Sequence, residues 1–119
     1  MRRLLAMIAF FSFTLLAQRS NYNGTWKAQL ATPAGKTENV LVLKTTGDKV
    51  TGTLKNDAGE FPVQNGSVEG DDIFFTVLVK RNGADFKMTY RGHMFGNEEI
   101  QFKIEAGDDI FDMVAQKVT

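Results

Sequence analysis

The chain alternates between apolar and polar residues from Thr25 to Val118, which is the period-two pattern of β-strands with one buried face. Glycine beside aspartate or asparagine, as in Gly47-Asp48 and Asn82-Gly83, interrupts this alternation at short intervals and favours tight hairpin turns. The pattern predicts eight strands, with no sustained helical stripe between them. The expected strands are Gly24–Thr32, Thr37–Thr46, Lys49–Asn56, Glu60–Glu69, Ile73–Lys80, Asp85–Phe95, Glu99–Glu105 and Ile110–Val118.

Short strands in hairpin succession predict an antiparallel up-and-down meander. Pairing of the first strand with the last would close this meander into a barrel and remove both exposed edges. We therefore expect an all-β fold, an eight-stranded antiparallel barrel, with an open two-sheet sandwich as the alternative. Pro62 falls within the fourth strand, where a residue without an N–H group requires a bulge or a non-donating position.

The alternation also predicts which side chains fill the barrel and which lie outside it. An eight-stranded barrel is just filled by its side chains or keeps room for one small ligand, so a packed core and an apolar pocket at one mouth are both open. Space opposite Gly52 and Gly92 would favour the pocket. The residues expected on the outer face are Val40, Val42, Phe74 and Leu78. The expected inward set is Trp26, Leu30, Leu41, Leu43, Val50, Leu54, Phe61, Val63, Ile73, Phe75, Val77, Phe86, Met88, Tyr90, Met94, Ile100, Phe102, Phe111 and Met113.

The start of the chain has the pattern of an export signal. Arg2 and Arg3 precede the uncharged apolar run Leu4–Ala17, which is too short to span a bilayer as a helix. The small residue Ala17 is followed by polar residues and predicts cleavage after it, with an uncleaved anchor or an amphipathic helix on the membrane surface as alternatives. The expected organisation is an N-terminal signal-peptide helix at 1–17, a short tail at 18–23 and a single β-barrel domain at 24–119, located in the periplasm or secreted.

The composition argues against several classes of function. Lys and Arg together number 14, as do Asp and Glu, and this balance argues against a protein that binds nucleic acid through phosphate contacts. The absence of cysteine excludes disulfides, thiol nucleophiles and cysteine-based metal sites. His93 is the only histidine, and its alternation with Lys87 and Arg91 predicts that it faces solvent. We expect no cofactor and no metal.

The residues that could perform catalysis are poorly placed for it. Ser67 lies between two turn glycines, and the acidic residues cluster at turns such as Asp71-Asp72 and Asp108-Asp109. Nothing in the alternation points two carboxylates into a common cleft, as glycoside hydrolysis requires. We therefore assign no catalytic residue and expect a non-enzymatic protein. A hydrolase or isomerase that uses carboxylates at the barrel mouth is the enzymatic alternative.

Two short motifs resemble those of a known group of barrels. Gly24-Thr25-Trp26, which opens the first strand after an export segment, resembles the Gly-x-Trp signature of the calycins, the lipocalins and avidins. Thr51-Gly52-Thr53-Leu54 is similar to the avidin pattern Thr-Gly-Thr-Tyr. The resemblance implies a calycin-like barrel in which the tryptophan packs across the closed end.

The chain departs from the avidins at the positions of their biotin ligands. Ala28 stands where the family has an asparagine, Leu54 replaces a tyrosine, and Trp26 is the only tryptophan. The resemblance therefore does not imply biotin binding. The spacing of the Gly-x-Trp and Gly-x-Val-x-Gly-Asp-x-Ile-x-Phe motifs is also similar to that of small exported bacterial barrels, found alone or appended to secreted hydrolases, which implies a fold and a compartment but no activity.

These observations predict an exported, non-enzymatic β-barrel binding module that holds a small apolar or amphipathic ligand at the barrel mouth. Tyr90 is the expected polar contact, and flexible methionines suit an irregular ligand. The alternative is a fully packed structural or interaction module with a protein partner. We expect no nucleic-acid partner and no stable membrane anchor after cleavage. The expected ligand-binding residues are Trp26, Phe75, Met88, Tyr90, Met94 and Phe102.

Overall fold

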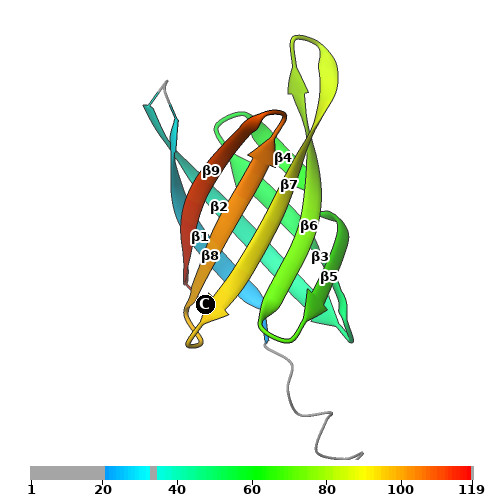
Figure 1. Ribbon diagram of the computed structural model, residues 1–119, viewed down its shortest axis with the longest axis vertical. Coiled ribbons are helices and arrows are strands. Elements are labelled where there is room, and N and C mark those ends of the chain that lie inside the picture. Colours follow the sequence, from blue (N-terminus) through cyan, green and yellow to red (C-terminus); the bar gives the residue numbers. More distant parts are fainter. Residues whose placement is uncertain (1–20, 33–34, 119) are drawn as a thin grey trace, which may run out of the picture.

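The protein forms a closed antiparallel β-barrel. The computed structural model describes residues 21–32 and 35–118, and every regular element within these ranges is a strand. The barrel closes where the first strand, β1 (Gly24–Thr32), pairs with the last, β9 (Asp109–Lys117) (Figure 1). The other strands are β2 (Gly35–Thr46), β3 (Lys49–Asn56), β4 (Gly59–Pro62), β5 (Gln64–Glu69), β6 (Asp72–Arg81), β7 (Ala84–Phe95) and β8 (Glu99–Ala106). The predicted all-β barrel is confirmed, and the open sandwich is excluded.

The expected fourth strand is interrupted. β4 and β5 both pair with β3, at its residues 53–56 and 49–50 respectively, so the two short strands share one position in an eight-stranded barrel. The break follows Pro62, which has no N–H group to donate. Just beyond it, Asn65 has a positive φ of 54°, where the register between β5 and β6 is irregular. The sequence signal at Pro62 thus marks a real break in the strand.

This interruption leaves a seam in the barrel wall between β4 and β6. Among the described strands, β6 pairs with β5 only as far as Thr76, and its residues 77–81 pair with β7 alone. β4 likewise pairs only with β3. Because β8 begins to pair with β7 at Met88, residues 77–87 form a two-stranded hairpin. This β6–β7 hairpin projects beyond the rest of the barrel (Figure 1).

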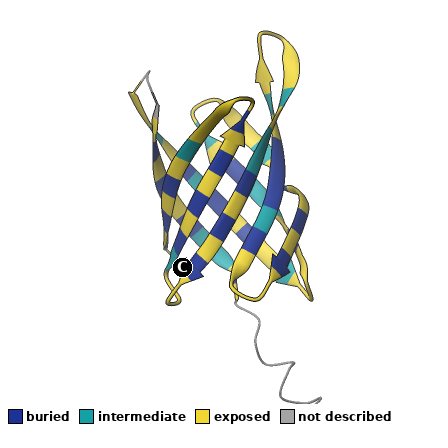
Figure 2. Ribbon diagram, in the orientation of Figure 1, coloured by how far each residue is buried: buried dark blue, intermediate teal, exposed yellow. Residues whose placement is uncertain are grey.

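Buried and exposed residues alternate along the strands (Figure 2). The buried ones are mostly apolar and form the core of the barrel. All but four of the positions expected inside are buried, and those four, Phe61, Phe86, Met88 and Phe111, are half-buried. The four apolar residues expected on the outer face are all at least partly exposed there. The alternation therefore predicted the inner face of nearly every strand.

Three aromatic rings occupy the middle of the barrel. Phe75 stacks on Tyr90 with ring centroids 4.8 Å apart, and Phe102 meets Phe75 and Tyr90 edge-on at 5.9 and 5.8 Å. A Cβ added at Gly92 would lie 2.7 Å from the Phe102 ring, so that ring already fills the space over the glycine. At Gly52 an added Cβ would lie 1.9 Å from the carbonyl oxygen of Val42. The expectation that both glycines leave space for a ligand is therefore wrong, because neighbouring groups occupy it.

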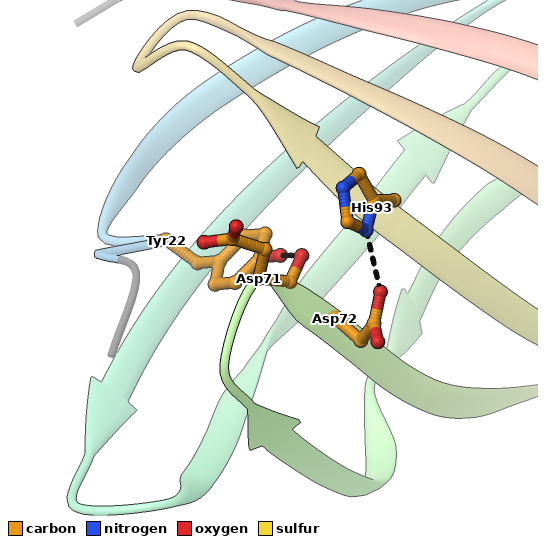
Figure 3. A network of polar contacts seen from close by, with 4 residues as sticks. All are labelled: Tyr22, Asp71, Asp72 and His93. Carbon is orange, nitrogen blue, oxygen red and sulfur yellow. Dashed lines mark hydrogen bonds and ion pairs between the residues drawn. The ribbon is translucent and has the colours of Figure 1, made fainter. Parts of the chain in front are cut away.

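Tyr22 and Trp26 seal one end of the barrel. Both side chains are fully buried, although Tyr22 precedes β1. The indole N–H of Trp26 donates to the Tyr22 carbonyl at 3.0 Å. The Tyr22 hydroxyl donates to the Asp71 carbonyl (Figure 3). The same carbonyl also accepts from the Met94 N–H at 2.9 Å. The tryptophan therefore packs at a closed end, as the Gly-x-Trp resemblance implies.

Residues 1–20 lie outside the described part of the chain, and so does the predicted signal peptide with its cleavage point. Residues 33–34 and 119 are also outside it. Within the described ranges, no helix has the length and the apolar character needed to span a membrane.

Candidate functional site

The end of the barrel opposite Trp26 contains a cavity of about 240 Å³, which we call the mouth cavity. Its walls come from β1, β2, β3, β6 and β7, and the turn between β3 and β4 forms part of its rim. The residues that line it are Leu30, Thr37, Asn39, Leu54, Asn56, Asp57, Ala58, Val79, Met88 and Tyr90.

Tyr90 brings a hydroxyl group to this cavity. Its side chain is only 2% exposed, and its hydroxyl makes no hydrogen bond within the described residues. In the same part of the chain, no side-chain polar atom is both sealed from solvent and without a partner. The Tyr90 hydroxyl therefore opens into the mouth cavity. Burial raises the pKa of Tyr90 to about 12, so the phenol keeps its proton near neutral pH.

A pair of asparagines forms the polar side of the cavity. Asn39 is 3% exposed, and its side-chain oxygen accepts a hydrogen bond from Nδ2 of Asn56 at 2.9 Å. The side-chain oxygen of Asn56 accepts in turn from the Ala58 N–H at 2.9 Å, which fixes the orientation of its amide. Asn39 Nδ2 donates to the Thr37 carbonyl at 3.4 Å. Each amide oxygen thus accepts one hydrogen bond within the protein, and each amide nitrogen carries a further hydrogen.

The rest of the lining is apolar, with one charge at the rim. Leu30, Leu54, Val79 and Met88 supply the hydrocarbon surface. Among the described lining residues, only Asp57 is charged, and it lies on an exposed turn. The cavity therefore suits a small molecule with an apolar body and few polar groups.

The six residues expected to bind a ligand lie at three levels of the barrel. Met88 and Tyr90 line the mouth cavity. Phe75 and Phe102 pack against Tyr90 in the middle of the barrel, outside the cavity lining. Trp26 and Met94 belong to the sealed end, where the Met94 backbone contacts the carbonyl bonded by Tyr22.

Sequence reasoning missed the polar residues of this cavity. Asn39 carried a usable signal, because it occupies the inward side of the alternation that continues through Leu41 and Leu43. A polar residue at an inward position is unusual unless it has a partner or a function. Asn56 and Asp57 carried no such signal, because they lie at the end of a strand and in a turn, where both residue types are common.

A larger hollow, of about 550 Å³, lies on the outer face of β5 to β8. It includes His93, whose side chain is 47% exposed, and the Nδ1 atom of this residue lies 2.6 Å from Oδ1 of Asp72 (Figure 3). The two cations beside it form their own cross-strand pairs, Arg91 with Glu105 at 3.5 Å and Lys103 with Asp112 at 2.6 Å. His93 thus faces outward, as predicted, on a surface of paired charges.

No group of three or more His, Asp or Glu residues in the described ranges is arranged to hold a metal ion. Comparison with known proteins finds no matching family model, no matching curated protein and no matching solved structure. The geometry of the mouth cavity is therefore the main guide to function.

Proposed function

We propose that the protein is an exported, non-enzymatic, calycin-like barrel that binds a small apolar or amphipathic molecule in the mouth cavity. The observation that carries this proposal is the Tyr90 hydroxyl, which opens into the largely apolar mouth cavity and has no hydrogen-bond partner in the described part of the protein. A molecule bound in the cavity would pair with this hydroxyl.

The volume of the cavity limits the size of the ligand. An engineered apolar cavity of about 150 Å³ binds benzene, whereas sites for larger ligands begin near 300 Å³. At about 240 Å³, the mouth cavity suits one ring with a few additional atoms, or one end of a longer molecule. Phe75 and Phe102 pack against each other, and neither they nor Trp26 belong to the lining of the cavity. The cavity therefore does not extend toward Trp26.

The same lining supports a binding role over a catalytic one. It offers one carboxylate, from Asp57, and one phenol, whose pKa is raised to about 12. General acid–base catalysis works best with a group that titrates near the working pH. The export part of the proposal rests on Arg2, Arg3 and the apolar run Leu4–Ala17.

The proposal can be tested by titrating the purified exported protein with small aromatic compounds such as toluene. The backbone amide NMR shifts of the protein report the binding. We expect saturable binding with shifts centred on Leu54, Val79 and Tyr90. Met88→Trp should fill the cavity and abolish binding. Val114→Trp, at a 44% exposed position on the outer face, is the matched control and should bind as the wild type does.

The packed interaction module is the alternative outcome of this test. It is supported by the interlocked rings in the middle of the barrel and by exposed apolar residues such as Val42 and Phe95, each 47% exposed. If the folded wild-type protein shows no saturable shift with any small aromatic compound, the binding proposal fails and this alternative stands.

A further inference from the structure

We infer that the ligand of the mouth cavity presents an uncharged carbonyl group, as in a ketone, ester or amide, to the hydroxyl of Tyr90. This inference rests on the proposed function and narrows the class of ligand. It follows from three properties of the described lining: the fixed position of Tyr90, the presence of further donors beside it, and the absence of a cation.

Tyr90 is held in one orientation. Phe75 covers one face of its ring at a centroid distance of 4.8 Å, and Phe102 meets the ring edge-on at 5.8 Å. The side chain cannot turn away without opening the packed core, so its hydroxyl is already aimed before a ligand enters. Such preorganisation favours a partner at a defined place, because little rotamer entropy is lost on binding.

The lining offers further hydrogen-bond donors beside the Tyr90 hydroxyl. The side-chain oxygens of Asn39 and Asn56 each accept one hydrogen bond within the protein, from Asn56 Nδ2 and from the Ala58 N–H respectively. Each of the two amide nitrogens still carries a hydrogen beyond the bonds described. A carbonyl oxygen accepts two hydrogen bonds, so it can take one from the Tyr90 hydroxyl and one from a neighbouring donor.

The charge of the lining disfavours a carboxylate in the same place. No lysine, arginine or histidine is among the described lining residues, and the one charge present is the negative Asp57 at the rim. A carboxylate beside Tyr90 would lose its hydration without gaining an opposite charge, which is costly in apolar surroundings. Asp57 would add repulsion to this cost.

Three probes of nearly the same shape separate these contributions: acetophenone, α-methylstyrene and benzoate. The second replaces the carbonyl oxygen of the first by CH2, and the third carries the negative charge. Titration by NMR at pH 7 should show acetophenone binding roughly 3- to 10-fold more tightly than α-methylstyrene, the effect of one net hydrogen bond. Benzoate should bind at least about tenfold more weakly than acetophenone.

Two tyrosine variants locate the effect. Tyr90→Phe should remove the preference for acetophenone over α-methylstyrene. Tyr22→Phe removes the hydroxyl of the other buried tyrosine, at the sealed end, and should leave the preference intact. If Tyr90→Phe does not fold, the infrared C=O stretch of acetophenone bound to the wild type decides the point, and it should move to lower frequency than in hexane.

The outcomes distinguish this inference from the proposed function. If none of the three probes binds, both fail. If α-methylstyrene or benzoate binds as tightly as acetophenone, or if the preference survives Tyr90→Phe, the carbonyl assignment is overturned while the mouth cavity remains a binding site. An unshifted C=O stretch also overturns the assignment.

Discussion

At the scale of single residues, the two ends of the barrel differ in whether the polar groups of their buried aromatic side chains have hydrogen-bond partners within the protein. The Trp26 indole N–H and the Tyr22 hydroxyl both donate to backbone carbonyls, so the sealed end is complete within the protein. The hydroxyl of Tyr90 has no such partner among the described residues. The first arrangement contributes to stability, and the second is the basis of the binding site that we propose.

Trp26→Ala tests the structural role of the sealed end. Because Trp26 is fully buried, the substitution should lower the free energy of unfolding by about 3–5 kcal/mol. Urea unfolding of the two proteins provides the measurement. Phe95→Ala, at an outward position that is 47% exposed, serves as the control and should cost less than about 1 kcal/mol. Equal losses for the two variants would show that Trp26 does not close the core.

The buried tyrosines predict a loss of stability at alkaline pH. Burial raises the pKa of Tyr90 from 10.0 to about 12. Burial, together with the charges of Asp72 and Asp71, also raises the pKa of Tyr22. Above pH 10 the unfolded chain releases these protons and the folded chain retains them, so stability is complete below pH 10 and falls as pH rises toward 12.

The comparison of wild type with Tyr90→Phe isolates this effect from the titration of lysines. Urea midpoints measured from pH 8 to pH 11.5 should fall less steeply for the variant, because phenylalanine has no proton to release. Parallel curves for the two proteins would mean that the Tyr90 hydroxyl titrates equally in the folded and unfolded chains.

His93→Ala should change little. The side chain is 47% exposed, and its partner Asp72 is 70% exposed, so water screens their interaction, and such pairs contribute about 0–1 kcal/mol. Unfolding by urea and probe binding at the mouth cavity should both remain close to wild type. A tenfold loss of binding with the fold intact would place the ligand on the outer face of β7.

At the scale of the strands, the sequence predicted whatever depends on local alternation. The inward positions of β7 and β8 follow directly from period two, and Pro62 marked the break after β4. Tyr22 could not be predicted as core, because its burial depends on how the end of a closed barrel is covered and it precedes the first strand. Asp57 reaches the cavity only because the β3–β4 turn lies at the mouth, which no local pattern encodes.

The glycines show the same limit of prediction from sequence. The alternation of residues predicts which face of the sheet a glycine lies on, but not which side chains pack against it. Gly92 lies opposite Phe102 in the β7–β8 pairing, and a Cβ there would lie 2.7 Å from the ring and 2.8 Å from Ile73. Gly92→Ala should therefore destabilise the fold by about 1–3 kcal/mol through overpacking. Ser67→Ala, at an exposed position on β5, should stay within about 0.5 kcal/mol of wild type in urea unfolding.

At the scale of the whole molecule, the barrel is asymmetric, with one sealed end and one end that holds a cavity. Closure through β1 and β9 joins the two ends of the meander at residues 26–28 and 115–117, as expected from the order of the strands. Among the described strands, backbone groups lack a second neighbouring strand at the seam between β4 and β6 and along the projecting β6–β7 hairpin. They also lack one beyond the β1–β9 contact, where residues 29–32 and 35–38 pair only with each other and residues 109–114 pair only with β8.

Amide hydrogen exchange should reveal this difference along β6. Residues 72–76 pair with strands on both sides, apart from the irregular stretch beside Asn65, whereas residues 77–81 pair with β7 alone. In the second group, we expect the amides that point away from β7 to exchange quickly, on the timescale of exposed loops. Uniform protection along β6 would mean that the seam is closed in solution.

The seam also offers a route to the mouth cavity for the ligand that we propose. Val79 lines the mouth cavity and belongs to the part of β6 that has no strand bonded on its seam side. Parting the wall at this point separates side chains but breaks no ladder of hydrogen bonds, so it needs only the microsecond motions typical of loops and hairpins. The proposed ligand would then enter and leave between β4 and β6 without the breaking of any strand pair.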